Sequence, residues 1–556
     1  MNRFVFAAAA AFLAAGCGKI PSPHVPAPTS AVDVQILALN DFHGNIERPS
    51  DAVRFELAKD QFATASAGGA AIVGQELANL RSGHDYSITV AAGDLIGASP
   101  LTSAYFLDEP TIDAMNLMDL RLASVGNHEF DKGSAELLRM QNGGCEKYTK
   151  RVPCQLEPFK GAHFQYLAAN VLKADGTTIF PATTIRQFGP IRIGFIGMTL
   201  KQTATLVTPS GVAGLRFADE AATANALVPQ LKAAGADTIV LLIHQGGKVA
   251  DSYHLRDCEG LSGDILPVLD KLDPAIATVI SGHTHNAYDC EIERGGVRRL
   301  LTSAGKYGYF VTDLRLDFDP RTHRLLAQNA RNVPMIRQGA GDPAIAALVD
   351  RYAAAVAPIG DRVVGHLTAA AAKNGEEAES PAADLIADSM LEAAKGDAQI
   401  ALVNATGVRV DLPGGDVRYK DAFAMMPFGN NLVVMTLTGA QLKAALEQQY
   451  AIPPKAKGIK PAVLASSAGF NYSVDLSMPE GSRISAMRLN GRSVDASRAY
   501  RVVLNNYLAS GGDGLSEFTA GTDVKDTGII DLDALIDWIA KGQTPPVPNR
   551  IRFAAP

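Results

Sequence analysis

This chain of 556 residues lacks three features, and each absence excludes a class of protein. The formal net charge is −7, with 51 Lys and Arg against 58 Asp and Glu, and there is no basic stripe, so binding to a nucleic-acid duplex is not indicated. The five cysteines lie outside the candidate metal motifs described below, which argues against a structural thiolate zinc site. The N-terminal apolar run Phe4–Ala15 is too short to span a bilayer as a stable helix. The length instead favours two or more domains.

The N-terminus has the organisation of an export signal. Arg3 precedes the apolar run, and the segment Ala14-Ala15-Gly16-Cys17 resembles a bacterial lipobox, in which Cys17 becomes the lipidated first residue. Ordinary signal cleavage near the same place is the alternative. We expect residues 1–16 to be a signal peptide and residues 17–32, which are rich in proline, to be an extended tether. The lipobox predicts a lipid anchor, and Gly18 favours the outer membrane of a Gram-negative bacterium, with the chain in the periplasm or at the cell surface.

The remaining cysteines are even in number. Setting Cys17 aside leaves four, which in an oxidising compartment suggests two disulfides. Three pairings are possible. We predict Cys145–Cys154, which would close a polar local loop, and Cys258–Cys290, which would join two loops that follow candidate metal motifs.

Five short polar motifs each follow an apolar, strand-like run. The runs are Val34–Leu39, Ile88–Ala92, Leu122–Val125, Thr238–Ile243 and Ala277–Ile280. The motifs are Asn40-Asp41-Phe42-His43-Gly44, Gly93-Asp94, Gly126-Asn127-His128-Glu129, His244-Gln245-Gly246 and Gly282-His283-Thr284-His285. Short apolar runs of this kind suit strands buried on both faces, and ligands bind beyond the carboxyl ends of such strands. We therefore expect the five motifs to converge on one small volume.

The residue types in these motifs indicate a metal site. Carboxylate, imidazole and amide oxygen suit divalent zinc, manganese, cobalt or magnesium. The motifs supply seven candidate ligands, more than a four-coordinate site can use, but they fit two ions that share a bridging carboxylate. Two ions about 3.5–4 Å apart can clamp the attacking and leaving oxygens of an in-line displacement. A single motif of this kind is more often a turn or a helix cap than a metal site. The prediction of a metal site therefore rests on the occurrence of all five motifs in series.

In this order and form, the motifs resemble those of the calcineurin-like metallophosphoesterases, and within them the 5'-nucleotidase family of secreted and periplasmic enzymes. The resemblance covers nearly the whole mature chain. It implies that one ion is held by Asp41, His43, Asp94 and His285. It implies that Asp94 bridges to a second ion, completed by Asn127, His244 and His283.

The resemblance also assigns the residues next to the ligand Asn127. His128 corresponds to the catalytic histidine, and Asp131 to the carboxylate that orients it. The spacing supports this pair, because an acid three residues on can reach back across one turn. A positioned imidazolium would stabilise charge developing on the phosphate and the leaving oxygen. The alternative for Asp131 is an acid at a helix start, favoured by the helix dipole. No role is predicted for Glu129.

The alternation of elements predicts the fold class. Residues 33 to about 340 alternate strand-like runs with amphipathic patterns such as Gly69–Leu80 and Glu220–Ala234. This indicates a layered α/β architecture, and the resemblance implies a four-layer α/β/β/α metallophosphoesterase sandwich. The periodically apolar segment Asp342–Val356 predicts a helix within a linker at residues 341–361. Residues 362–556 are expected to form a smaller α+β domain for substrate recognition.

Three segments of the C-terminal half resemble family segments that bind the nucleotide. They are Asn404-Ala405-Thr406-Gly407-Val408-Arg409, Met426-Pro427-Phe428-Gly429-Asn430 and Asn506-Tyr507-Leu508-Ala509-Ser510-Gly511-Gly512-Asp513. The resemblance implies substrate contacts from Asn404 and Arg409. Two facing rings, Phe428 and Tyr507, would sandwich the base, and Asp513 would accept hydrogen bonds from ribose hydroxyls.

One departure from the family pattern concerns the phosphate. Ahead of Glu379 the family commonly places arginine that reaches the substrate phosphate, whereas this chain has Asn374-Gly375-Glu376-Glu377-Ala378, with Lys373 as the nearest base. Asn471 stands near another position where a basic residue is frequent. Arg409 is left as the predicted phosphate ligand.

We therefore predict an exported, metal-dependent phosphoric ester hydrolase. Its substrate would be a nucleoside 5'-monophosphate, cleaved by in-line attack of a metal-bound hydroxide. One alternative keeps the metals but acts on UDP-sugars, 2',3'-cyclic nucleotides or another phosphomonoester. The other is a surface lipoprotein that binds nucleotides without catalysis, and the complete set of seven ligands argues against it.

Overall fold

The computed structural model describes residues 31–49, 52–58, 61–250, 258–336, 339–373, 379–450 and 463–554. The predicted signal peptide, the lipidation site Cys17 and most of the predicted tether lie outside the described residues. The segment 374–378, where the sequence departs from the family pattern, also lies outside them.

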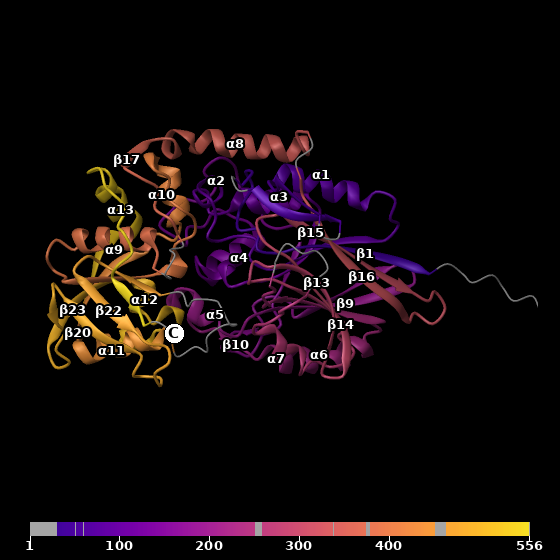
Figure 1. Ribbon diagram of the computed structural model, residues 1–556. Helices are drawn as coiled ribbons and strands as arrows, with labels where there is room; N and C mark the ends of the chain where they lie inside the picture. The colour runs from indigo at the N-terminus through magenta and orange to yellow at the C-terminus, as the bar shows by residue number, and fades with distance from the viewer. Residues whose placement is uncertain are drawn as a thin grey trace, which may run out of the picture.

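Two six-stranded sheets form the centre of the N-terminal half (Figure 1). The first has the order β16 (Leu325–Pro334), β15 (Phe310–Phe318), β1 (Val32–Leu39), β4 (Ser87–Ala92), β5 (Leu120–Ser124) and β6 (Gln165–Leu167). The second has the order β13 (Ala287–Arg294), β14 (Val297–Ala304), β12 (Thr278–Ser281), β11 (Thr238–His244), β9 (Ile191–Thr199) and β8 (Thr183–Phe188). Of the strands that precede the five polar motifs, β1, β4 and β5 run parallel to one another in the first sheet, and β11 and β12 do so in the second, so their carboxyl ends lie at one edge of each sheet. All five predicted strands are therefore confirmed.

Both faces of these strands are buried, which explains their continuous apolar sequences. In β1, Ile36 and Ala38 pack into a cluster shared with the second sheet, while Leu37 and Leu39 point to the opposite face and pack beneath helices. Successive side chains alternate between the faces of a strand, so a strand covered on both sides must be apolar throughout.

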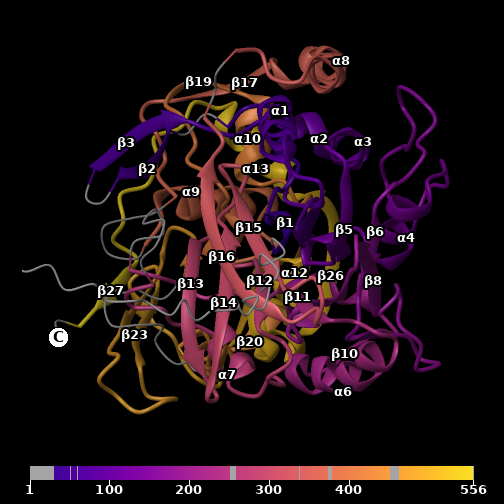
Figure 2. The same cartoon turned by 90° about the vertical axis from the view of Figure 1, so that its right-hand side faces the viewer.

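Helices cover the outer face of each sheet, as Figure 2 shows from the side. The helices of this half are α1 (Ala70–Arg81), α2 (Leu101–Ala104), α3 (Glu109–Leu117), α4 (Ser134–Asn142), α5 (Thr203–Leu206), α6 (Glu220–Ala233) and α7 (Ile265–Leu269). Two short strand pairs complete the N-terminal half. They are β2 (Ala52–Ala58) with β3 (Gln61–Ser66), and β7 (Val171–Leu172) with β10 (Arg216–Phe217). The arrangement is the predicted α/β/β/α sandwich.

A long helix, α8 (Pro343–Gly360), follows the sandwich and runs along the top of both halves in Figure 1. Its N-cap is Asp342, whose carboxylate accepts hydrogen bonds from the backbone N–H groups of Ala344 at 2.9 Å and Ile345 at 3.0 Å. The helix packs so closely on α1 that a Cβ on Gly74 would clash with the side chain of Ile345. The predicted helix is thus present and extends to Gly360.

The C-terminal half has a five-stranded sheet of order β21 (Leu464–Ser466), β18 (Ile400–Asn404), β25 (Ala499–Asn505), β20 (Asn431–Thr438) and β26 (Thr522–Ile530). A four-stranded sheet has the order β24 (Arg492–Ser493), β23 (Ile484–Leu489), β22 (Phe470–Val474) and β27 (Ile551–Phe553), and β17 (Val363–Leu367) pairs with β19 (Gly415–Arg418). The helices are α9 (Pro381–Ala393), α10 (Tyr419–Met425), α11 (Gly439–Gln448), α12 (Asn506–Ala509) and α13 (Asp531–Ile539). This is the mixed α+β composition predicted for the segment.

Both predicted disulfides are present, with Cα–Cα distances of 5.6 Å for Cys145–Cys154 and 5.7 Å for Cys258–Cys290. The loop closed by Cys145–Cys154 also reaches the C-terminal half. Lys150 Nζ donates to Asn431 Oδ1 at 3.2 Å, and the guanidinium carbon of Arg151 lies 5.8 Å from the centre of the Phe423 ring. The loop therefore contacts both halves of the molecule.

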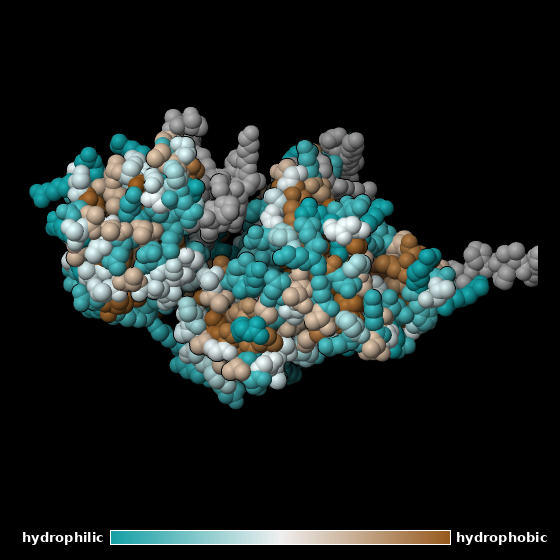
Figure 3. All heavy atoms as spheres, turned by 90° about the horizontal axis from the view of Figure 1, so that it is seen from below, coloured by the Kyte–Doolittle hydropathy of each residue, from teal (hydrophilic) through white to brown (hydrophobic). Residues whose placement is uncertain are grey.

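The surface seen in Figure 3 is mainly hydrophilic, with hydrophobic residues in small groups between polar ones. Such scattered apolar residues are usual for a protein surface. Among the helices of the described residues, none combines the length and the apolar character required to cross a membrane.

Candidate metal centre

The predicted ligands meet at the carboxyl ends of β1, β4, β5, β11 and β12. The donor atoms of the six carboxylate and imidazole ligands, together with a ring nitrogen of His128, form three groups, and within each group the atoms lie within 4.8 Å of one another. The groups are Asp41, His43 and His285; His43, Asp94 and His128; and Asp94, His244 and His283. The separate motifs of the sequence are thus brought into one compact cluster.

The backbone is strained at most of these positions. Five of the seven predicted ligands have a left-handed backbone, with φ of 49° at Asp41, 48° at His43, 51° at Asp94, 73° at His283 and 60° at His285. Residues other than glycine rarely adopt this conformation, and where they do the surrounding structure must hold them there. Such strain concentrated in one cluster marks a functional site.

Two imidazole rings are oriented by backbone carbonyl groups. Nδ1 of His43 donates to the carbonyl oxygen of Gly97 at 2.9 Å, and Nδ1 of His244 donates to that of Ala92 at 2.8 Å. A carbonyl oxygen can only accept, so each Nδ1 carries the hydrogen and each Nε2 faces the cluster. This is how metal-binding histidines are usually held.

The donor set fits two divalent ions. Nε2 of His43 lies 3.1 Å from Nε2 of His285, so two ring nitrogens meet where a shared cation would satisfy both. Among the described residues, the buried Oδ1 of Asn127 has no hydrogen-bond partner, which is costly unless a ligand reaches it. Nε2 of His285 is also 3.4 Å from Oδ1 of Asp41.

The protonation of the cluster is consistent with cation binding. Burial lowers the pKa of His43 well below its usual value, and burial with the nearby His244 lowers that of His283 to about 3. Both rings are therefore neutral at physiological pH. For His244, burial lowers the pKa, but the charge of Asp94, whose Oδ2 lies 2.9 Å from Nε2, raises it to about 10. A divalent ion bound here would replace that proton.

His128 and Asp131 form the predicted pair. Nδ1 of His128 lies 2.7 Å from Oδ2 of Asp131, and the backbone N–H of His128 donates to Oδ1 of Asp94 at 2.9 Å. Burial alone lowers the pKa of His128, but the charges of Asp131 and Asp94 outweigh it, so the pKa is raised. The two carboxylates thus favour the charged form of the His128 ring.

Glu129, for which the sequence predicted no role, joins two of the loops that carry predicted metal ligands. Its buried carboxylate accepts hydrogen bonds from the backbone N–H groups of Asp94 at 2.9 Å, Leu95 at 2.8 Å and Gly126 at 2.6 Å. Gly126 cannot carry a side chain, because its Cβ would clash with the Asp94 carboxylate. Glu129 therefore fixes the backbone that presents the predicted bridging ligand. The sequence gives only a weak indication of this role, because an acidic residue after a histidine is common.

Three of the predicted substrate-binding residues, Asn404, Tyr507 and Asp513, form one hydrogen-bonded group in the C-terminal half. The carboxylate of Asp513 accepts from Asn404 Nδ2 at 3.0 Å, from Thr406 Oγ1 at 2.7 Å and from the Tyr507 hydroxyl at 2.8 Å. The Tyr507 hydroxyl also lies 3.1 Å from the carbonyl oxygen of Thr205 on α5. This group therefore sits where the two halves meet.

Phe428 lies beside the metal cluster, and the charge of Arg409 acts on it. The Phe428 ring is stacked on that of His128, with a centroid distance of 6.1 Å and an interplanar angle of 17°. After burial, the charge of Arg409 helps to lower the pKa of His43 and His285, and it partly offsets the rise in the pKa of His128. The sandwich of a base between Phe428 and Tyr507 stays a prediction, since Phe428 here contacts His128.

Comparison with known families matches both halves of the chain. The calcineurin-like phosphoesterase family matches residues 34–287, and the 5'-nucleotidase C-terminal domain family matches residues 363–520. The chain belongs to the 5'-nucleotidase family of metallophosphoesterases. The matched N-terminal family is one of phosphoesterases, and its fold implies a centre for divalent ions.

Individual relatives cover most of this chain. It is 28% identical over 559 residues to endonuclease YhcR of Bacillus subtilis (strain 168), covering 98% of this chain and 42% of the length of that protein. It is 24% identical to an NAD 5'-nucleotidase of Haemophilus influenzae, covering 89% of this chain and 87% of that one. The crystal structure of a 5'-nucleotidase precursor from Thermus thermophilus has a TM-score of 0.76 at 25% identity, covering 94% of this chain and 99% of that one. The chain thus spans less than half of the Bacillus relative.

Proposed function

We propose that this member of the 5'-nucleotidase family hydrolyses nucleoside 5'-monophosphates to nucleoside and inorganic phosphate. The observation that carries the proposal is the stacking of Phe428 on His128 beside the cluster of predicted ligands, together with the charge of Arg409, which acts on three histidines there. An aromatic ring, a guanidinium and a hydrolytic centre at one place suit a substrate that has a base and a phosphate. We divide the chain into a metal domain at residues 33–340, a linker at 341–361 and a recognition domain at 362–556.

The predicted ligand sets divide the cluster into two sites. Asp41, His43, Asp94 and His285 would hold one divalent ion. Asp94, Asn127, His244 and His283 would hold the other. When bound, two such ions supply Lewis-acid stabilisation of the charge on the phosphate oxygens. Zinc, manganese, cobalt and magnesium are all compatible with these oxygen and nitrogen donors.

His128 would act on the reacting phosphate or its leaving oxygen. In hydrolysis the oxygen of water forms a bond to phosphorus, the bond from phosphorus to the 5' oxygen of ribose breaks, and that oxygen takes up a proton. Nδ1 of His128 is held by Asp131, which leaves Nε2 to donate a hydrogen bond or a proton. Asp131 keeps the ring charged and oriented.

Recognition of the nucleotide would come from the C-terminal half. Phe428 and Tyr507 would contact the base, Asn404 and Asp513 the sugar, and Arg409 the phosphate. Asp513 is pre-oriented by its hydrogen bonds to Asn404, Thr406 and Tyr507. Pre-ordering of this kind lowers the entropic cost of binding.

A substrate panel tests the proposal. Phosphate release is measured from nucleoside 5'-monophosphates, UDP-sugars, 2',3'-cyclic nucleotides and an aryl phosphate, each with zinc, manganese, cobalt or magnesium. We expect the highest kcat/KM for a nucleoside 5'-monophosphate. A higher value for a cyclic nucleotide or a simple aryl phosphate would contradict the proposal.

We further propose that the chain is exported and anchored through Cys17. Two disulfides support an oxidising compartment, because such bonds are rare in the reducing cytosol. Cys17→Ser should release the protein from the membrane fraction or block its processing. Wild-type protein that is fully soluble, with an unmodified N-terminus beyond residue 17, would contradict the anchor.

A further inference from the structure

The ring of Phe428 belongs to a short loop, Met426–Asn430, which joins α10 to β20 and is called the Phe428 segment below. This segment brings the ring to His128, on which Phe428 is stacked. The end of the segment is fastened to the start of α13, because the backbone N–H of Asp531 donates to the carbonyl oxygen of Asn430 at 2.8 Å. The place of the Phe428 ring beside the metal cluster therefore depends on how Asp531 holds Asn430.

Asp531 is a buried acid at the first residue of α13. Its Oδ1 accepts a hydrogen bond from the backbone N–H of Leu532 at 2.8 Å. Burial raises the pKa of Asp531 to about 7, although hydrogen bonds from Leu532 and from the side chain and backbone of Asn430 oppose the rise. The carboxyl group therefore changes its charge near neutral pH while it is in contact with the end of the Phe428 segment.

The surroundings of Asp531 supply no compensating positive charge within the part of the chain that the structure describes. On the same helix, the charge of Asp533 adds to the rise in the pKa of Asp531. On β26, Asp526 accepts from Asn431 Nδ2 at 2.8 Å, and Lys150 of the other half donates to Asn431 Oδ1 at 3.2 Å, so both charges are bound to Asn431. The elements α9, α10 and β17 pack against α13 through apolar side chains of one core cluster.

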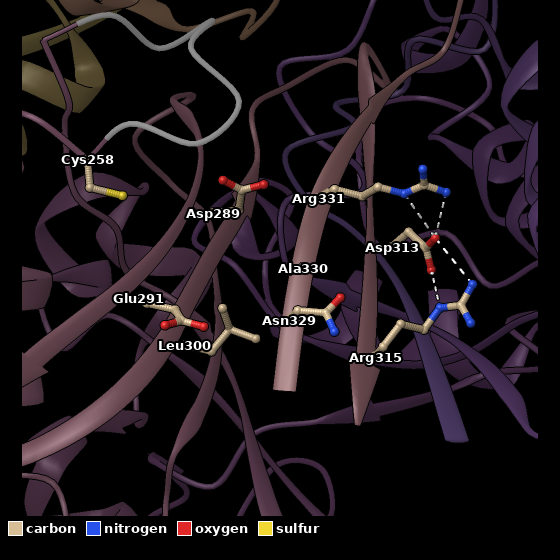
Figure 4. Close-up of a pocket in the computed structure, with 9 residues that line it drawn as sticks. All are labelled: Cys258, Asp289, Glu291, Leu300, Asp313, Arg315, Asn329, Ala330 and Arg331. Atoms are coloured by element: carbon tan, nitrogen blue, oxygen red, sulfur yellow. Dashed lines mark hydrogen bonds and ion pairs between the residues drawn. The ribbon is translucent and has the colours of Figure 1, made fainter. Parts of the chain in front are cut away.

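Asp313 shows how a buried acid of this molecule behaves when bases are present. In Figure 4, Arg315 and Arg331 both point at its carboxylate. Nε of Arg315 lies 2.9 Å from Oδ1 of Asp313, and Nη2 of Arg331 lies 3.1 Å from Oδ2. Burial raises the pKa of Asp313, but the hydrogen bonds and the charge of the bases outweigh burial and lower it. Asp313 therefore stays ionised near neutral pH, whereas Asp531 gains or loses its proton there.

We propose that Asp531 is a positioning residue for base recognition, because it holds the end of the Phe428 segment against α13. The proposal rests on the proposed function, and it places a specificity determinant beyond the matched C-terminal family segment, which ends at residue 520. The ionised carboxylate accepts hydrogen bonds with both oxygens, and such charge-assisted bonds are stronger than neutral ones. Protonation places a hydrogen on one oxygen, so the segment is held less firmly and the Phe428 ring is less ordered.

The direction of the pH effect follows from the charge that Asp531 carries. Its carboxyl group is protonated below its pKa and ionised above it, so the Phe428 segment is held best on the alkaline side of about pH 7. The affinity for the base of a nucleotide should therefore increase as the pH rises through this range. An aryl phosphate has no nucleobase to be held, so Asp531 should not alter its hydrolysis.

The test compares pH profiles of the wild type and of Asp531→Asn from roughly pH 6 to roughly pH 8. The measured quantity is kcat/KM for a nucleoside 5'-monophosphate divided by kcat/KM for an aryl phosphate. In the wild type this ratio should rise about fivefold with pH, mainly through the KM of the nucleotide. In Asp531→Asn it should lack this rise and stay near the low-pH value, because the amide does not ionise. Ionisations of the metal centre and of the substrates are common to both proteins, so the difference between the two profiles reports Asp531.

Two further variants complete the test. Asp533→Asn is the matched control, because it removes an exposed acid from the same first turn of α13. It should keep the rise of the ratio, with the midpoint moved slightly to lower pH, since the charge of Asp533 raises the pKa of Asp531. Asn430→Ala leaves Asp531 in place but removes the side chain that donates to it, so it should lower the ratio on the alkaline side.

The outcomes distinguish the positioning role from a structural one. A wild-type ratio that does not depend on pH, or a rise that is the same in Asp531→Asn, would overturn the proposal. Equal losses of nucleotide and aryl phosphate hydrolysis in Asp531→Asn and Asn430→Ala would also overturn it, because Asp531 would then support the fold and not the base. A wild-type protein that releases no phosphate from any nucleotide would instead refute the proposed function itself.

Discussion

The metal cluster and the nucleotide-recognition residues are held in place by different means. The ligands stand on loops at the ends of buried strands, with left-handed backbone at five positions and backbone carbonyls that fix His43 and His244. The recognition residues come from three separate loops of the C-terminal half, and side-chain hydrogen bonds around Asp513 hold them. The first region is held by backbone contacts within the sandwich, whereas the Tyr507 hydroxyl of the second region also contacts α5 of the other half. We therefore expect chemistry and recognition to be separable by mutation.

The largest effect is expected within the metal cluster. Asp94→Asn removes the carboxylate that we assign to both ions, so activity should fall by several orders of magnitude on every substrate, and bound metal should drop below two ions per chain. His128→Ala should lose activity with nearly normal metal content, since His128 is not an assigned ligand. Metal analysis that finds Asp94→Asn fully loaded and His128→Ala empty would show that these roles are reversed.

The next effect concerns the pH profile. The pKa of His128 is raised by Asp131, so the imidazolium persists to higher pH and its contribution is lost only as pH rises through that pKa. Asp131→Asn removes the charge that raises it, so the alkaline limb of kcat/KM should move to lower pH, with roughly a hundredfold loss at neutral pH. Metal content should stay normal in this variant. An alkaline limb that does not move would assign that limb to a different group.

Substitution of the aromatic residues should affect recognition alone. Phe428→Ala or Tyr507→Ala should each cost roughly 1–3 kcal/mol of base stacking, about ten- to a hundredfold in kcat/KM for a nucleotide. Hydrolysis of an aryl phosphate, which has no base, should change far less. If both substrates lose equally, the rings are structural, and the separation of the two regions fails.

The smallest effect is expected from the loop that links the regions. The Cys145–Cys154 loop contacts Asn431 through Lys150 and Phe423 through Arg151, on either side of the Phe428 segment. Replacing both cysteines by serine should raise KM for nucleotides a few-fold through a less ordered loop, with aryl phosphate hydrolysis unchanged. The equivalent double change at Cys258 and Cys290 is the control, since that bridge contacts no recognition residue within the described part of the chain. Identical KM values in both variants and the wild type would exclude the loop from recognition.

The metal cluster could be predicted from sequence because its signal is local. Buried strands require apolar runs, and a polar residue directly after such a run stands at the sheet edge, so the position of Asp41 or His244 follows from the chain alone. Glu129 gave no such signal, because its role depends on three backbone N–H groups from two loops that are far apart in sequence. The stacking of Phe428 on His128 was also not predictable, because it depends on how the two halves dock.

The central claim is that a single metal centre hydrolyses every substrate, whichever group the recognition domain binds. A metal titration followed with two substrates in parallel tests this claim most directly. Metal-free protein is loaded with increasing equivalents of zinc or manganese, and phosphate release is followed from a nucleoside 5'-monophosphate and from an aryl phosphate. We predict that both activities rise together and level off at two equivalents per chain, and that Phe428→Ala lowers only the nucleotide curve. Saturation at one equivalent, or different metal requirements for the two substrates, would contradict a single dimetal centre.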